Sequence, residues 1–147
     1  MSYNPNYTGS STDVLSKITG AFVDNNSGGT LTKGTPVRID SVGNLNIIDV
    51  SSEIESLAIV GVILEDVLNT EQGRLICNGR LDDISGFILG DSIYVSKTGT
   101  LTNTKPDIGV GGFVAGDFII RIGVISKNEI NPGQDDLLLN ITITGQL

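Results

Sequence analysis

The chain has 147 residues, with 17 acidic and 9 basic side chains and a formal net charge of −8. Its length fits one domain, and its acidity excludes a nucleic-acid surface, which needs clustered lysine and arginine. The same charge opposes contact with anionic membranes. No charged and then apolar leader opens the sequence, and no apolar run approaches the roughly 18 residues of a membrane span.

The first segment, residues 1–17, is polar, rich in turn-forming residues and without a hydrophobic period. Such a segment cannot build a core of its own, so we interpret it as an extended N-terminal arm, either frayed or ordered against a partner. Tyrosines provide large contact area at low entropic cost. The predicted docking residues are the two tyrosines and those between them: Tyr3, Asn4, Pro5, Asn6 and Tyr7.

After the arm, the pattern predicts strands almost throughout. The first predicted strand covers residues 18–25 and ends in a turn rich in Asn and Gly. A hairpin follows, with arms at 36–40 and 45–50. Residues 51–58 begin with serines typical of helix N-caps, which predicts one short helical turn.

A continuous apolar run over residues 58–67 predicts a central strand covered on both faces. Gly61 inside it indicates a bulge or a close backbone approach. Residues 73–81 predict another strand, interrupted by Asn78-Gly79. The single cysteine, Cys77, lies there in an apolar setting and is predicted to be buried, and one cysteine excludes an internal disulfide.

The second half begins with a hairpin whose arms are residues 92–96 and 100–103, followed by an apolar strand at 118–126. A loop at 130–136 precedes a final strand at 137–145. An apolar terminal strand needs a partner, either from its own barrel or from a neighbouring subunit. The predicted oligomer contacts are its large aliphatic residues: Leu137, Leu138, Leu139, Ile141 and Ile143.

The chain also contains an internal repeat. GTPVRIDSVGNLN, residues 34–46, recurs without a gap as GDSIYVSKTGTLT, residues 90–102, and VGVILED, residues 60–66, resembles IGVISKN, residues 122–128. Each half therefore consists of a hairpin, a spacer and an apolar strand. The predicted fold class is all-β, a small barrel or sandwich built from two pseudo-repeated hairpin-plus-strand halves, because closure removes exposed edges.

Residues suited to catalysis are scarce. The absence of histidine excludes Ser-His-Asp and Cys-His arrangements and leaves no ligand set for zinc. Three acidic pairs, Glu65-Asp66, Asp82-Asp83 and Asp135-Asp136, lie at predicted strand ends or turns, where solvated acids are ordinary. The glycine-rich stretch 109–116 lacks the ending of a phosphate loop and reads as a connector. We therefore predict no enzymatic activity and no cofactor or metal.

Four segments together resemble a known family: VDNNSGGTLTKGTPVRID, IVGVILEDV, GDSIYVSKTGTLTNTKPD and IIRIGVISK. They look like a small β module of tailed-bacteriophage virions, which occurs in tail-fibre and head-fibre polypeptides and is similar to capsid decoration proteins. The resemblance covers residues 18–128. Outside it lie the arm, residues 1–17, and a C-terminal loop and strand, residues 129–147, for which pairing in its own barrel and pairing with a neighbouring subunit are the two alternatives.

The resemblance implies a non-enzymatic virion part, assembled in the host cytoplasm, commonly a homotrimer, that attaches to other virion proteins. We expect a capsid-associated head fibre or decoration protein anchored by its arm. One alternative is a tail or baseplate fibre adaptor. A second alternative, from another class, is a carbohydrate-binding β-domain, although such sites depend on stacking aromatics and this chain has only four Phe and three Tyr.

Overall fold

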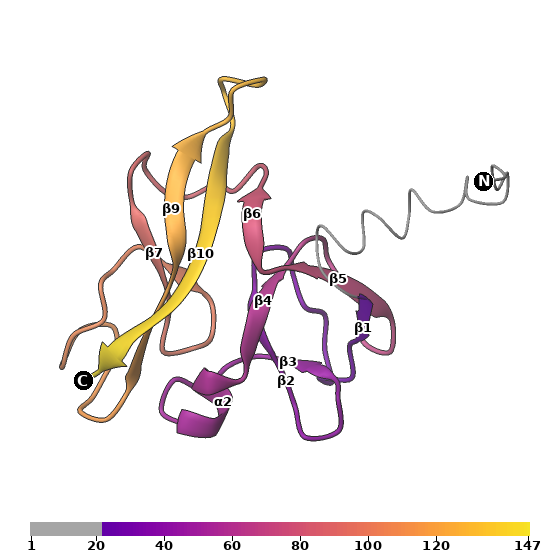
Figure 1. Cartoon of the computed structure of the whole chain (residues 1–147), viewed down its shortest axis with the longest axis vertical. Coiled ribbons are helices and arrows are strands. Elements are labelled where there is room, and N and C mark those ends of the chain that lie inside the picture. Colours follow the sequence, from indigo (N-terminus) through magenta and orange to yellow (C-terminus); the bar gives the residue numbers. More distant parts are fainter. Residues whose placement is uncertain (1–21) are drawn as a thin grey trace, which may run out of the picture.

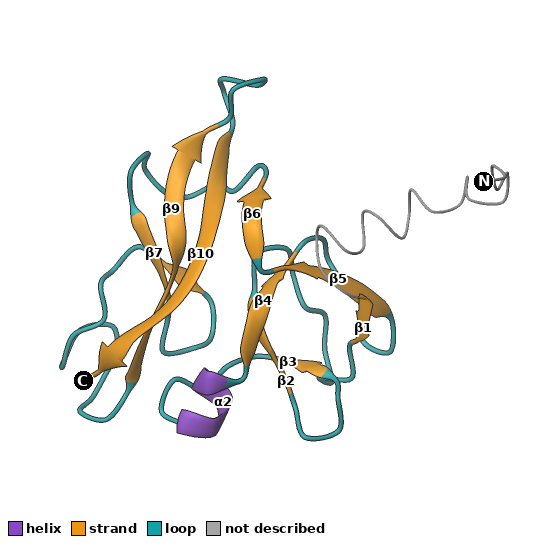
Figure 2. Ribbon diagram, viewed as in Figure 1, coloured by secondary structure: helices purple, strands orange, loops and turns teal. Residues whose placement is uncertain are grey.

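The computed structural model describes residues 22–147, so the predicted arm and the start of the first predicted strand lie outside the described residues. In the described part, short strands and one brief helix are joined by tight turns (Figure 1, Figure 2). The elements are β1 (Phe22–Asp24), β2 (Pro36–Ile39), β3 (Leu45–Asn46), α2 (Glu53–Leu57), β4 (Ile59–Ile63), β5 (Gln72–Ile76), β6 (Asn78–Leu81), β7 (Ser92–Val95), β8 (Leu101–Thr102), β9 (Phe118–Lys127) and β10 (Asp135–Gln146).

The strands form two five-stranded sheets in which every paired strand is antiparallel to its neighbour, and this confirms the predicted all-β class. The first sheet has the order β1-β5-β4-β2-β3, and the second has the order β6-β10-β9-β7-β8. Adding five to each strand number of the first order gives the second. The repeat in the sequence is therefore a repeat of topology, and it extends to β10, beyond the residues in which the sequence reveals it.

The paired glycines of the repeat have the same structural role in both halves. Gly34 and Gly90 have φ of 85° and 88°, a left-handed conformation that glycine adopts without strain. Each amide then donates to the long apolar strand of its own half, Gly34 N to Ile63 O and Gly90 N to Ile125 O, both at 2.8 Å. The glycines thus fix how the hairpin joins the sheet.

The bulge predicted at Gly61 is present, and it occurs twice. Val37 pairs with Gly61 but the next residue, Arg38, pairs with Ile59, so one residue of β4 is left over. In the second sheet Ile93 pairs with Gly123, and the following pair again skips one residue of β9. Both glycines also allow close approach, since a Cβ on Gly61 would lie 2.6 Å from the Ile76 carbonyl oxygen, and one on Gly123 would overlap the Leu138 carbonyl.

The strand predicted at residues 73–81 is two strands in two different sheets. The chain leaves the first sheet at Cys77, between β5 and β6, and β6 pairs with β10 in the second sheet. The predicted interruption is confirmed, but it falls one residue before Asn78-Gly79. Cys77 itself is exposed, so the prediction of a buried thiol is wrong.

Each half contributes to a separate apolar core. The core of the first sheet comprises Leu31, Val37, Leu45, Ile63, Val67 and Leu75. A bridge between Asn25 and Leu45 joins the two edges of this sheet, which closes it around that core. The larger core belongs to the second sheet but also takes in Ile48, Val50, Val62 and Ile76 from the first half. The two halves are therefore packed against each other through shared aliphatic side chains.

Candidate interaction surface

The described residues carry no arrangement typical of a reactive centre. Among them, no group of three or more Cys, Asp and Glu side chains is placed to hold a metal ion. No helix within residues 22–147 has the length and apolar character needed to cross a membrane. The buried polar side chains must then be explained by the contacts that they make with the chain itself.

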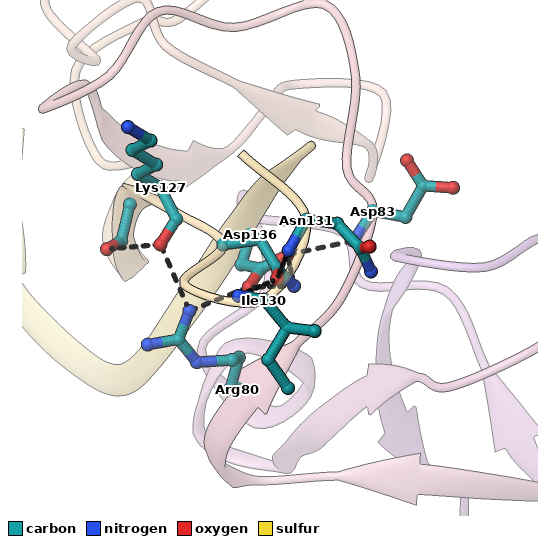
Figure 3. Close-up of polar contacts among 8 residues, drawn as sticks. Arg80, Asp83, Lys127, Ile130, Asn131 and Asp136 are labelled. Carbon is teal, nitrogen blue, oxygen red and sulfur yellow. Dashed lines mark hydrogen bonds and ion pairs between the residues drawn. The ribbon is translucent and has the colours of Figure 1, made fainter. Parts of the chain in front are cut away.

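Asp136 on β10 is the centre of one such set of contacts (Figure 3). Its carboxylate is fully buried and accepts hydrogen bonds from Arg80 Nη1 at 2.7 Å, from the Asp83 amide at 3.1 Å and from Asn128 Nδ2 at 2.9 Å. Asn128 Oδ1 in turn accepts the amides of Ile130 and Asn131. This cluster, which we call the Asp136 cluster, fixes the β9–β10 hairpin end against the chain that follows β6.

The charge of Asp136 is compensated where it lies. Burial alone would raise the pKa of this carboxyl, but the hydrogen bonds from Arg80, the Asp83 amide and Asn128 outweigh burial and hold the pKa below its usual range. The pKa of Arg80 is raised, chiefly by its hydrogen bond to Asp136. Asp136 was expected to be a solvated acid at a strand end, and that prediction is wrong because it is buried against Asn128 and against two partners, Arg80 and the Asp83 amide, that lie more than 50 residues away in the sequence.

Asp117, just before β9, is a second buried carboxylate and is almost inaccessible to solvent. Lys97 Nζ lies 2.7 Å from both of its oxygens, and the Val114 amide donates to Oδ2 at 2.9 Å. Burial opposes ionisation, yet the Lys97 hydrogen bond and the amide keep the pKa of Asp117 below its usual value. This ion pair ties the end of the glycine-rich connector to the second hairpin.

In the first half, the buried side chain of Asn25 holds loops together, as Asp117 and Asp136 do in the second half. Its side chain is fully buried, donates to the carbonyls of Gly29 and Val67 at 2.9 Å, and accepts from the amide and hydroxyl of Ser27. It thereby joins the loop after β1 to the β4–β5 turn. Among residues 22–147, the buried side chains of Asn25, Asp117, Asn128 and Asp136 are thus occupied in fixing loops, and Ser56 is the one buried polar side chain without such a contact. The surfaces are therefore the candidate functional features.

The two hairpin ends of the repeat present equivalent exposed aliphatic residues. Val62 pairs with Ile76 in the first half as Val124 pairs with Leu138 in the second, and this register places Leu68 and Ile130 at corresponding positions. Leu68 is 55% exposed and Ile130 is 88% exposed. Each is followed by an asparagine in the sequence. Both hairpin ends therefore offer an apolar side chain for contact.

A larger apolar feature lies where the two halves diverge. β4 and β10 flank a groove of about 340 Å³ lined by Leu57, Ile59, Val60, Cys77, Ile141 and Ile143. In Figure 1, β4 and the lower part of β10 separate below the point at which β5 passes into β6. We call this feature the β4–β10 groove. Among residues 22–147, no charged side chain lines it, which suits an apolar occupant.

The residues predicted to contact partners fall into three groups: those outside the described residues, those buried in the core and those that remain accessible. The docking residues Tyr3, Asn4, Pro5, Asn6 and Tyr7 lie outside the described residues. β10 lies between β6 and β9 of its own chain, and its Leu137 and Leu139 are buried in the chain's own core, where a partner cannot reach them. Leu138 is 38% exposed. Ile141 and Ile143 are half-buried and line the β4–β10 groove.

Sequence reasoning missed the Asp136 cluster and the groove. The only signal of the first was an Asn and an Asp flanking a predicted loop, a pattern that also describes exposed turns. Comparison with known proteins adds no further assignment, since the chain matches no protein-family model and no curated protein.

Proposed function

We propose that the chain is a non-enzymatic structural protein of a bacteriophage virion, attached to the capsid as a head fibre or decoration protein through its N-terminal arm. The observation that carries this proposal is the place of the motifs that resemble the phage module. They fall on β2, β4, β7, β8 and β9, the strands that build both halves of the repeat.

The character of the molecule supports an attachment role. The buried polar side chains Asn25, Asp117 and Asp136 hold loops in place, and the features left open are apolar surfaces. A rigid body with apolar contact points and an arm suits repeated, modest contacts, and many equivalent copies on a particle would add avidity to them.

The test removes part of the arm and leaves the rest of the chain unchanged. A variant lacking residues 2–8, which removes Tyr3 through Tyr7, is expected to retain the thermal unfolding midpoint and oligomeric state of the full chain but to lose binding to capsids of its own phage. Because the deletion ends well before β1, loss of binding would not reflect loss of the fold. Decoration at full occupancy by the truncated protein would contradict the proposal.

Copy number then separates head from tail. Quantitative mass spectrometry of purified particles is expected to give the high copy number of a component distributed over the capsid surface. A small copy number that matches the symmetry of the tail would instead favour the fibre-adaptor alternative.

A further inference from the structure

The β4–β10 groove is bordered by two strand edges that no described strand covers. β10 pairs with β6 only from Leu137 to Asn140, so its edge from residue 141 onward has no partner strand on that side within residues 22–147. β4 pairs with β5 only at Val62 and Ile63, which leaves residues 59–61 without a described partner strand on the β5 side, although β2 pairs with them on the other side. Uncovered edges beside apolar side chains are the usual setting for addition of another strand.

The repeat indicates what belongs there. In the second half, β10 continues past Leu139, which pairs with Gly123, and covers β9 as far as Phe118. In the first half the position corresponding to Leu139 is Cys77, where the chain turns away into β6. The first half therefore lacks the stretch equivalent to residues 140–146. The groove is the place that this stretch would occupy.

Another segment of the chain resembles the sequence of this stretch. LNITITG, residues 139–145, aligns without a gap with VLSKITG, residues 14–20, and the last three residues are identical. In β10 the alternate residues Leu139, Ile141 and Ile143 face the core side, and the residues between them are exposed. The same alternation places Ser16 and Ile18 toward the groove and Leu15, Lys17 and Thr19 toward solvent. Val14 corresponds to Leu139, a position that Cys77 occupies in the first half, so the added strand begins at Leu15.

Residues 15–20 of the same chain cannot reach this position. In the β10-like register Gly20 would lie beyond Ile59, at the start of β4. Phe22, however, pairs with Arg74 of β5, and the Arg74 carbonyl accepts the amide of Leu64, at the other end of β4. Five residue steps from Ile59 to Leu64 span about 16 Å. The two steps from Gly20 to Phe22 span at most about 7 Å. β5 also separates β1 from β4 in the sheet. The occupant must therefore belong to another copy.

We propose that residues 15–20 of a neighbouring copy of this chain add as a strand in the β4–β10 groove and complete the first half in the way that β10 completes the second. The contact is head-to-tail, because an arm of one copy meets a groove of the next. Such contacts form closed rings when the rotation between copies closes. The proposal does not depend on attachment to a virion, and it leaves residues 3–7 free for the capsid.

The single cysteine allows a direct test on the full-length chain. Cys77 lines the groove and is exposed, and the proposed register places Ser16 two residues along from it on the same face, within the Cα separation that a disulfide tolerates. Ser16→Cys protein treated with diamide is expected to give disulfide-linked multimers on non-reducing gels. The matched control is Ser2→Cys, outside the proposed segment, which is expected to give far less.

Each other outcome overturns the proposal. Absence of cross-linked multimers in Ser16→Cys protein, equal cross-linking in the Ser2→Cys control, or a disulfide-linked monomer would do so, and the last would show that the arm folds back on its own chain. Adding Cys77→Ser to Ser16→Cys identifies the bond, since it must abolish the multimers. As the experiment uses purified protein without capsids, its failure is distinct from failure of the proposed attachment.

Discussion

At the scale of single residues, the structure of this protein depends on a few buried polar groups and on glycines that allow close backbone contact. Asp136 and its neighbour Asp135 illustrate how position decides the role of a carboxylate. Successive side chains of a strand point to opposite faces, so Asp136 is buried and hydrogen-bonded while Asp135 is half-buried.

Replacing Asp136 by Asn should destabilise the fold strongly. The amide nitrogen of Asn is a donor and would face the Arg80 or Asn128 donors that now meet a carboxylate oxygen. Losing hydrogen bonds to a buried charged group costs about 1–3 kcal/mol, and the Arg80 side chain that is left behind is 36% exposed and so remains in contact with solvent. Urea unfolding should show this loss in Asp136→Asn but a change within about 0.5 kcal/mol in Asp135→Asn. Equal effects of the two substitutions would contradict the assigned role of Asp136.

Gly123 should be intolerant of a side chain. A Cβ there would overlap the Leu138 carbonyl of the paired strand, and relieving such an overlap costs about 1–3 kcal/mol. Gly133 has open space around its Cβ position, and its φ lies outside the left-handed region. We therefore expect Gly123→Ala to lower the free energy of unfolding by about 2 kcal/mol and Gly133→Ala to leave it unchanged or raise it slightly.

Some of these residue roles could be predicted from the sequence. The glycines of the repeat were recognisable because they recur at matching positions in both halves, and Gly61 was assigned to a bulge or close backbone approach because it lies inside an apolar strand. The roles of Asp117 and Asp136 were not, because their basic partners, Lys97 and Arg80, lie 20 and 56 residues away and are brought near only by the fold. Cys77 was assigned to the core from its apolar neighbours, whereas it lies at the point where the chain changes sheets.

At the scale of elements, α2 is the one helix among the described residues, and it shows how local signals and packing can conflict. Ser52 caps it, since its hydroxyl accepts the Glu55 amide at 3.2 Å. Ser56, one turn later, is fully buried, and its hydroxyl finds no hydrogen-bond partner among residues 22–147. A hydroxyl in that position costs stability rather than adding it.

Two serine substitutions in this helix should therefore act in opposite directions. Ser56→Ala removes an unpaired buried hydroxyl and improves helix propensity, so the free energy of unfolding should rise by about 1 kcal/mol. Ser52→Ala removes the cap and should lower it by about 1 kcal/mol. Thermal and urea unfolding of the two variants provide the measurement. Destabilisation by Ser56→Ala would indicate a partner for the hydroxyl.

Element boundaries were predictable where apolar patterns are strong and not where the repeat is hidden. The sequence predicts β9 and the capped helix to within two residues of their observed bounds. It does not reveal that β10 corresponds to β5, because the two strands follow equivalent turns, β4–β5 and β9–β10, but then take different paths. One continues along β9 and the other ends at Cys77. That difference is a property of the assembled sheets, and it creates the β4–β10 groove.

At the scale of the whole molecule, the two halves are equivalent in topology but not in independence. The first sheet closes around its own six-residue core. The core of the second sheet includes Val62 and Ile76 from the first half. The second half therefore depends on side chains of the first half to fill its core. Resemblance between the halves therefore predicts the strand order of each, but the sharing of core residues becomes visible only in three dimensions.

The response of this fold to pH follows from its buried carboxylates. The pKa values of Asp117 and Asp136 are lowered in the folded state, as are those of Asp40, Asp49 and Asp91, where hydrogen bonds from Asn44, Ser51 and Ile88 respectively are the leading cause. A carboxyl whose pKa is lower in the folded than in the unfolded chain stabilises the fold above its unfolded pKa, about 3.9. That stabilisation is lost as the pH falls through the folded value.

The thermal unfolding midpoint should therefore be nearly constant from about pH 5 to pH 7.5, since the chain has no histidine to titrate there, and should fall steeply below about pH 4. Falling net charge near the pI of about 4.2 reduces self-repulsion, but this weak surface effect should not offset loss of the buried contacts. In Asp136→Asn protein the midpoint should be lower at neutral pH and the acid fall shallower, because one of the titrating groups is gone. A wild-type midpoint that rises between pH 5 and pH 3 would show that charge repulsion, and not these carboxylates, controls the acid stability of the molecule.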